Sequence, residues 1–148
     1  MLTIPAMVRV GPWTLVELSK SHEWTNCERC DTPIKEIWTC TVNPAAAELL
    51  ARLDGKLEWR VGSVCGPALL EVSEQVWKDE TAGTMRRMRL LLKVEKLVAQ
   101  AADQGLELPT LIFERRELLL RGEVTDKQLR HLGLVVGTWT RKLKGPER

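Results

Sequence analysis

Four cysteines are the residues of this chain whose type and spacing could do chemistry. Cys27 and Cys30 form a C-x2-C pair, Cys40 follows ten residues later, and Cys65 lies in the stretch VGSVCGP. Thiolates are preferred ligands of zinc in structural sites, and a C-x2-C pair on a tight turn lets two sulfurs reach one ion. The spacing therefore predicts a zinc site with Cys27, Cys30, Cys40 and Cys65 as ligands.

Two alternatives to this ligand set remain open. His22, five residues before the pair, would take the fourth position if Cys40 points into the core. The four cysteines could also be buried free thiols, because cysteine is among the most buried residue types. The pair spacing and the glycine beside Cys65 favour zinc. Four thiolates would leave no open position for water, so the predicted zinc is structural.

The elements that must position these cysteines are read from turn residues and periodicity. Residues 2–10 and 13–18 favour strands, separated by a Gly-Pro turn, and residues 34–42 and 56–64 favour two more. In the third strand Ile34, Trp38, Cys40 and Val42 would share one face. Between the last two strands, residues 43–55 predict a short helix with Asn43 as N-cap and Gly55 at its exit. Cys65 would then stand at the start of another helix.

The second half of the chain has only helical patterns. Helices are predicted at residues 67–79, 84–105, 110–122 and 125–145. The last of them opens with Thr125 and Gln128, which have the spacing of a capping box.

The charge of the chain changes sign along its length. The net charge is +2, but residues 1–83 carry 8 Lys+Arg and 12 Asp+Glu, whereas residues 84–148 carry 14 and 8. With the boundary at Ala82–Gly83, this asymmetry predicts a zinc-binding module at 1–82 and a basic helical region at 83–148. The fold class expected is α+β, as one compact unit in which an N-terminal zinc-binding β-hairpin and helix module packs on a C-terminal helical bundle.

The segments around the cysteines resemble a known class of zinc module. CERCDTPIKEIWTCTV followed by WRVGSVCGPALL resembles a zinc knuckle, a β-hairpin and a cysteine at a helix start, over about residues 22–80. This order is similar to treble-clef and zinc-ribbon modules of small bacteriophage and mobile-element proteins. The chain departs from that pattern by its helical insert after residue 43 and by a single cysteine in the last knuckle. The resemblance implies structural zinc, and it leaves the partner open.

A basic stripe is the second functional feature. Arg86, Arg89, Lys93 and Lys96 are spaced three, four and three residues apart, so they would lie along one face of a helix. Such a row of like charges suggests an acidic partner, and a phosphate backbone is one candidate. The alternatives are an ordinary solvated face, or ion pairs with the acidic N-terminal half. Further basic residues could extend the surface: Arg87, Arg115, Arg116, Lys127, Arg130, Arg141, Lys142 and Lys144.

Other classes of function are disfavoured by what the sequence lacks. Its two histidines, His22 and His131, lie far apart, and no catalytic triad or glycine-rich phosphate loop is evident, so an enzyme is not expected. No apolar run approaches the ~20 residues of a membrane span, and the start does not resemble a signal peptide, which predicts a cytoplasmic protein.

The sequence thus predicts a small zinc-stabilised nucleic-acid-binding or regulatory protein. In this hypothesis zinc maintains the fold and the basic helix makes the contact. The alternative hypothesis is a phage-type adaptor or inhibitor that binds a host protein complex, such as a polymerase or a defence system. Affinity that falls steeply with salt would distinguish the first from the second.

Overall fold

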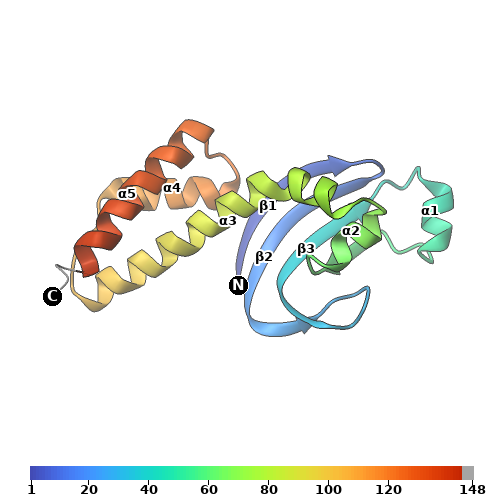
Figure 1. The fold of residues 1–148 in the computed structure, drawn as a ribbon, viewed down its shortest axis with the longest axis horizontal. Helices are drawn as coiled ribbons and strands as arrows, with labels where there is room; N and C mark the ends of the chain where they lie inside the picture. Colours follow the sequence, from blue (N-terminus) through green and yellow to red (C-terminus); the bar gives the residue numbers. More distant parts are fainter. Residues whose placement is uncertain (145–148) are drawn as a thin grey trace. The chain divides into compact units, whose positions relative to one another are not determined.

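The computed structural model describes residues 1–144 and has an α+β fold (Figure 1). In chain order its elements are β1 (Leu2–Val10), β2 (Trp13–Asn26), β3 (Pro33–Val42), α1 (Ala47–Arg52), β4 (Glu58–Val61), α2 (Cys65–Leu70), α3 (Glu74–Asp103), α4 (Thr110–Arg121) and α5 (Asp126–Lys144). The chain divides into two compact units, residues 1–84 and 85–148, and this division falls inside α3.

The N-terminal unit is built on a four-stranded sheet of order β1-β2-β3-β4. Each strand pairs antiparallel with the next one in the chain. The predicted strands are confirmed, but β2 continues past the expected end at residue 18 to Asn26. Cys27 and Cys30 therefore lie in the loop that joins β2 to β3.

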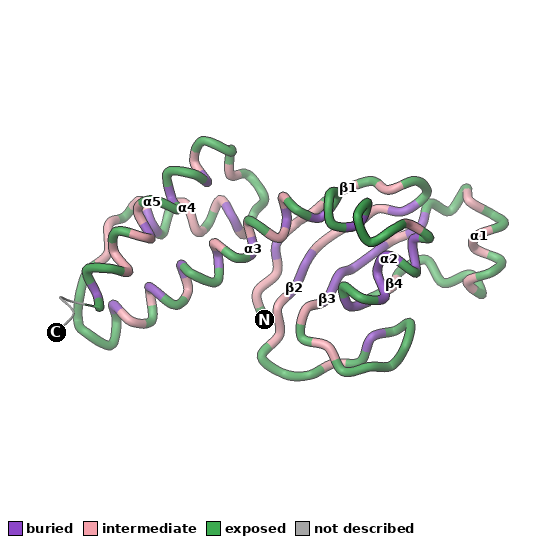
Figure 2. Tube along the Cα trace, viewed as in Figure 1, coloured by how far each residue is buried: buried purple, intermediate pink, exposed green. Residues whose placement is uncertain are grey.

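Two tryptophans join one face of this sheet to the helix that covers it. Trp77 of α3 meets Trp38 of β3 edge to face, with ring centroids 5.5 Å apart and an interplanar angle of 76°. Both rings are buried, and the buried stretches of β2 and β3 are purple in Figure 2. Trp38 is therefore a core residue, because its ring is 0% exposed.

Several helix boundaries differ from the predicted ones. Asn43 does not cap α1: its Oδ1 accepts a hydrogen bond from the Ala45 amide (2.9 Å), which closes a turn before the helix begins at Ala47. The predicted helix at 67–79 ends early, at Leu70, because Glu71 adopts a left-handed conformation with φ of 58°.

The predicted start of a helix at Thr84 is also wrong, because α3 begins ten residues earlier and passes through Gly83 without a break. A single glycine inside a helix costs only about 1 kcal/mol. The flanking residues Trp77, Thr81 and Met88 are all buried, so packing on both sides of Gly83 outweighs this cost.

The C-terminal unit consists of the rest of α3 with α4 and α5. Buried apolar residues recur along α3 at Met88, Leu91, Val94 and Leu97, and they share the core with residues of the other two helices: Ile112, Leu119, Leu129, Leu132 and Val136. The predicted capping box is confirmed, since the Gln128 amide donates to Thr125 Oγ1 (3.1 Å) and the Thr125 amide donates to Gln128 Oε1 (3.0 Å). The predicted end of this helix at residue 145 lies outside the described residues.

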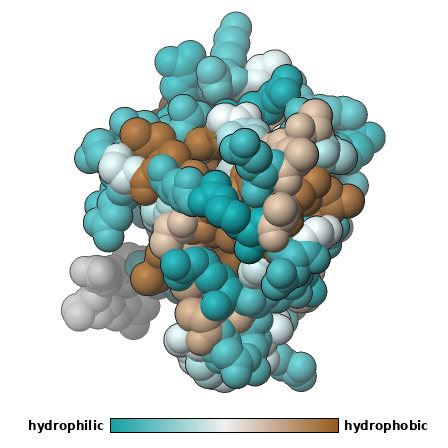
Figure 3. All heavy atoms as spheres, turned by 90° about the vertical axis from the view of Figure 1, so that its right-hand side faces the viewer, coloured by the Kyte–Doolittle hydropathy of each residue, from teal (hydrophilic) through white to brown (hydrophobic). Residues whose placement is uncertain are grey.

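Hydrophobic residues also reach the surface. On the side drawn in Figure 3 they form separate brown patches among hydrophilic side chains. Val64, next to Cys65 in the chain, is 88% exposed. None of the helices in residues 1–144 combines the length and apolar character needed to cross a membrane.

Candidate metal centre and basic hollow

The loop between β2 and β3 is a tight turn that holds the first two cysteines. The Cys27 amide donates to the Thr32 carbonyl (2.9 Å), and the Asp31 amide donates to the Cys27 carbonyl (2.8 Å). Asp31 has a positive φ of 61°, a conformation that aspartate tolerates better than most residues. This turn brings the side chains of Cys27 and Cys30 to the same place.

The same loop is tied to β4, the strand that leads to the third cysteine. The Glu28 amide donates to the Arg60 carbonyl (2.9 Å), and the Arg60 amide donates to Glu28 Oε1 (2.7 Å). Lys56 Nζ lies 3.2 Å from the same Glu28 oxygen. These contacts fix the distance between the loop and the end of β4.

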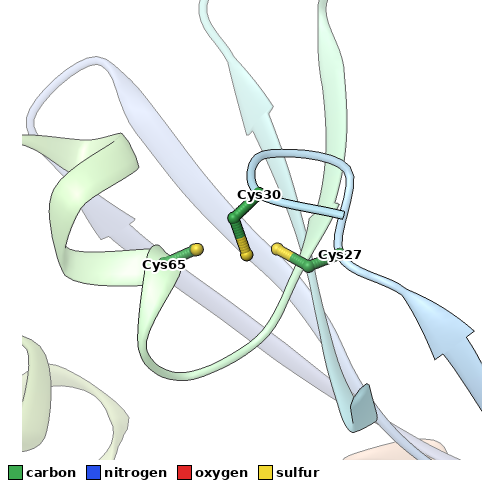
Figure 4. A group of neighbouring side chains, drawn as sticks. All are labelled: Cys27, Cys30 and Cys65. Carbon is green, nitrogen blue, oxygen red and sulfur yellow. The ribbon is translucent and has the colours of Figure 1, made fainter. Parts of the chain in front are cut away.

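Cys65 is the first residue of α2, as predicted, and its sulfur completes a cluster of three. The Sγ atoms of Cys27, Cys30 and Cys65 all lie within 4.8 Å of one another. Figure 4 shows the three side chains pointing toward one another from the loop and the helix start. Three thiolates that converge in this way are a donor set that fits a soft or borderline divalent ion such as zinc.

Cys40 and His22, the two predicted candidates for the fourth ligand, do not join this cluster. Cys40 is 0% exposed on β3, where it pairs with Leu15 and Trp59. It shares the strand face of Trp38, and the helices cover that face. Burial raises the pKa of Cys40 to about 12, so it stays a neutral thiol of the core. His22 is exposed on β2. The predicted four-cysteine set is thus corrected to three.

Two of the clustered thiols, Cys30 and Cys65, differ in how easily they ionise. Cys30 is exposed, and its hydrogen bond with Thr32 Oγ1 (3.2 Å), together with its contact with Cys65, lowers its pKa to about 7. Burial, followed by the neighbouring Cys30, raises the pKa of Cys65 to about 11. Cys30 therefore ionises before Cys65, and a bound cation would favour the thiolate form of Cys65.

Arg29 is a residue of this site that the sequence prediction missed. It stands inside the C-x2-C loop, and its Nη1 donates to Cys65 Sγ at 3.6 Å. Three thiolates around a divalent ion have a net charge of −1, which the guanidinium would balance. An arginine between two paired cysteines is the signal that could have indicated this role.

Replacing Arg29 tests its contribution to metal affinity. Arg29→Ala is expected to weaken zinc binding about tenfold, which is typical for loss of a partner that supports a metal ligand. Competition with a chromogenic chelator would measure the change. Arg60→Ala is the matched control, because the hydrogen bonds of Arg60 to this loop use its backbone. An equal loss in both variants would contradict a specific role for Arg29.

The basic stripe borders a hollow between α3 and α5 in the C-terminal unit. This hollow has a volume of about 450 Å³, and its lining includes Arg86, Arg89 and Lys93 but not Lys96, which is exposed elsewhere on α3. Arg130 joins from α5, and Leu90 and Leu129 add apolar surface. Asp126 is the single acidic residue in the lining. Three of the four predicted contact residues therefore lie around one depression.

The cations around the hollow lack close ion pairs in the part of the chain that the structure describes. Within residues 1–144, no ion pair shorter than 4.0 Å involves Arg86, Arg89, Lys93 or Arg130. Burial lowers the pKa of the neighbouring Arg87, and the charge of Asp126 offsets part of this effect. The positive charge around the hollow is left available to an acidic partner.

Comparisons of the chain with models of protein families, with curated proteins and with solved structures find no match. The arguments for function therefore depend on the residues and geometry described above.

Proposed function

We propose that this protein binds nucleic acid through the basic hollow of its C-terminal unit, and that zinc on Cys27, Cys30 and Cys65 stabilises its N-terminal unit. The observation that carries the proposal is the hollow itself. Four exposed cations, Arg86, Arg89, Lys93 and Arg130, surround it with one acidic residue among them. Placing like charges together is unfavourable for the fold alone, and phosphate groups would offset that repulsion.

Zinc is the metal that the cysteine cluster supports best. Thiolate ligands select soft or borderline ions, and zinc is the usual ion of such sites in proteins. The order of cysteine loop, paired strands β3 and β4, and a cysteine at the start of α2 supports a treble-clef-like module. In this proposal the metal joins segments that lie 35 residues or more apart in the chain.

Titration against fluorescent single-stranded DNA, duplex DNA and RNA tests the proposal. If four phosphates are neutralised, raising salt from about 50 to about 200 mM should weaken duplex binding about 150-fold and single-strand binding about 50-fold. The double variant Arg89→Glu/Lys93→Glu should abolish most of the binding at the lower salt, because it places two carboxylates against the phosphates.

A charge-matched control separates the hollow from general attraction. Arg9→Glu/Lys78→Glu changes the net charge by the same amount at two exposed positions of the N-terminal unit. This control should retain most of the affinity. Equal loss in both double variants would indicate nonspecific attraction, and no binding of any oligonucleotide at the lower salt would overturn the proposal.

A further inference from the structure

The cysteine cluster supplies one ligand fewer than a closed zinc site needs. Zinc in structural sites takes four ligands in a tetrahedron, whereas a site with three protein ligands keeps its fourth position for another group. Among the His, Cys, Asp and Glu side chains of residues 1–144, the group within ligand distance contains Cys27, Cys30 and Cys65 and no fourth member. The group that takes the fourth coordination position thus decides what kind of metal site this is.

A hollow opens directly beside the three sulfurs. It has a volume of about 320 Å³, and the three cysteines form part of its lining. Pro33, Ile34 and Val64 add apolar surface, and Lys35 adds a positive charge. Lys35 Nζ lies 4.8 Å from the ring centroid of Trp24, which is 67% exposed. Glu36 also lines the hollow, and its carboxylate pairs with Lys20 at 2.9 Å. The mouth of the metal site therefore combines apolar walls with one cation and one carboxylate that is already ion-paired.

We propose that the metal bound by Cys27, Cys30 and Cys65 keeps a fourth position that takes a thiolate from outside this chain. This inference rests on the zinc site of the proposed function. A sulfur donor matches the preference of an ion already held by thiolates. The apolar walls fit the short aliphatic stem of a cysteine-like thiol. Lys35 offsets the negative charge that a fourth thiolate would add, as Arg29 balances the charge of the first three.

Cobalt substitution tests the inference, because the absorption spectrum of bound Co²⁺ reports its ligands. The full chain loaded with Co²⁺ should bind one ion, and its thiolate-to-cobalt charge-transfer band should correspond to three sulfurs. Addition of N-acetylcysteine amide should raise that band by about one third, because a fourth Co–S bond joins three. N-acetylserine amide, which has a hydroxyl in place of the thiol, should leave the spectrum unchanged.

Matched variants identify the position of the added thiol. Lys35→Glu should weaken the response to N-acetylcysteine amide about fivefold while the cobalt content stays the same. The inference would be overturned if the protein without added thiol has a four-sulfur spectrum that becomes a three-sulfur spectrum in Cys40→Ala. It would also be overturned if His22→Ala alters the spectrum recorded before thiol is added. A four-sulfur spectrum that appears only at high protein concentration would show that a second copy of the chain supplies the thiolate.

The two proposals fail in different ways. Absence of bound cobalt would refute the metal site and the inference together. One bound cobalt with no spectral response to the thiol would refute the fourth position and leave the metal site intact.

Discussion

Cys65→Ser and Cys27→Ser are each expected to leave the protein without metal and to destabilise the N-terminal unit by about 3 kcal/mol, or about 15 °C in Tm. Binding of a structural zinc contributes directly to folding, because the unfolded chain has no preformed site. With two thiolates the cluster cannot hold the ion, and the β2–β3 loop loses its link to the start of α2. Elemental analysis and calorimetry of purified protein would measure both effects.

Cys40→Ala is the control for this experiment. Cys40 is as buried as Cys27 but lies outside the cluster. Its replacement should cost about 1 kcal/mol through a small cavity and leave one zinc per chain. Loss of metal from Cys40→Ala would contradict the three-cysteine site. Identical melting of the wild-type protein with zinc and in strong chelator would contradict the stabilising role of the metal.

Gly66→Ala is expected to destabilise the N-terminal unit by about 3 kcal/mol. A Cβ atom on Gly66 would lie 2.3 Å from the Trp77 ring, far inside van der Waals contact. Trp77 is held edge to face against Trp38, so it cannot move without disturbing the core. The effect should appear as a lower midpoint in chemical denaturation followed by tryptophan fluorescence.

An alanine substitution at Gly133 should have the opposite effect on stability. Gly133 lies in α5, and a Cβ atom built there meets nothing within 4 Å. Gly133→Ala should therefore stabilise the C-terminal unit by about 0.5–1 kcal/mol, because alanine is the better helix former. Destabilisation by both variants to a similar degree would indicate that the Trp77 contact is not the cause.

The sequence allowed correct prediction of features that depend on short stretches of chain. The C-x2-C pair closes its own turn through hydrogen bonds between Cys27, Asp31 and Thr32, so the spacing alone was informative. The capping box at Thr125 and Gln128 and the placement of Cys65 at a helix start are local in the same sense. The α+β class followed from the sum of such local signals.

The exclusion of Cys40 from the cluster could not be predicted, because it depends on which face of a strand the helices cover. Alternation correctly placed Cys40 on the face of Trp38, but spacing does not tell whether that face meets a metal or a core. Trp77, 39 residues after Trp38, decides the question by packing on that face. Likewise, Gly83 has the appearance of a helix boundary, and only buried neighbours on both sides explain why α3 continues through it.

The strand order of the sheet has a consequence for when the proposed metal site can form during synthesis. Because each strand pairs with the one made just before it, the sheet needs no pairing between strands that are distant in the chain, and such local contacts favour rapid folding. All three ligands have been translated by residue 65, and Trp77, which packs on the sheet, follows twelve residues later. At about 5–20 residues per second, the ribosome needs several further seconds to finish the basic helices. The metal centre can therefore assemble on the nascent chain before the surface that we propose for nucleic acid exists.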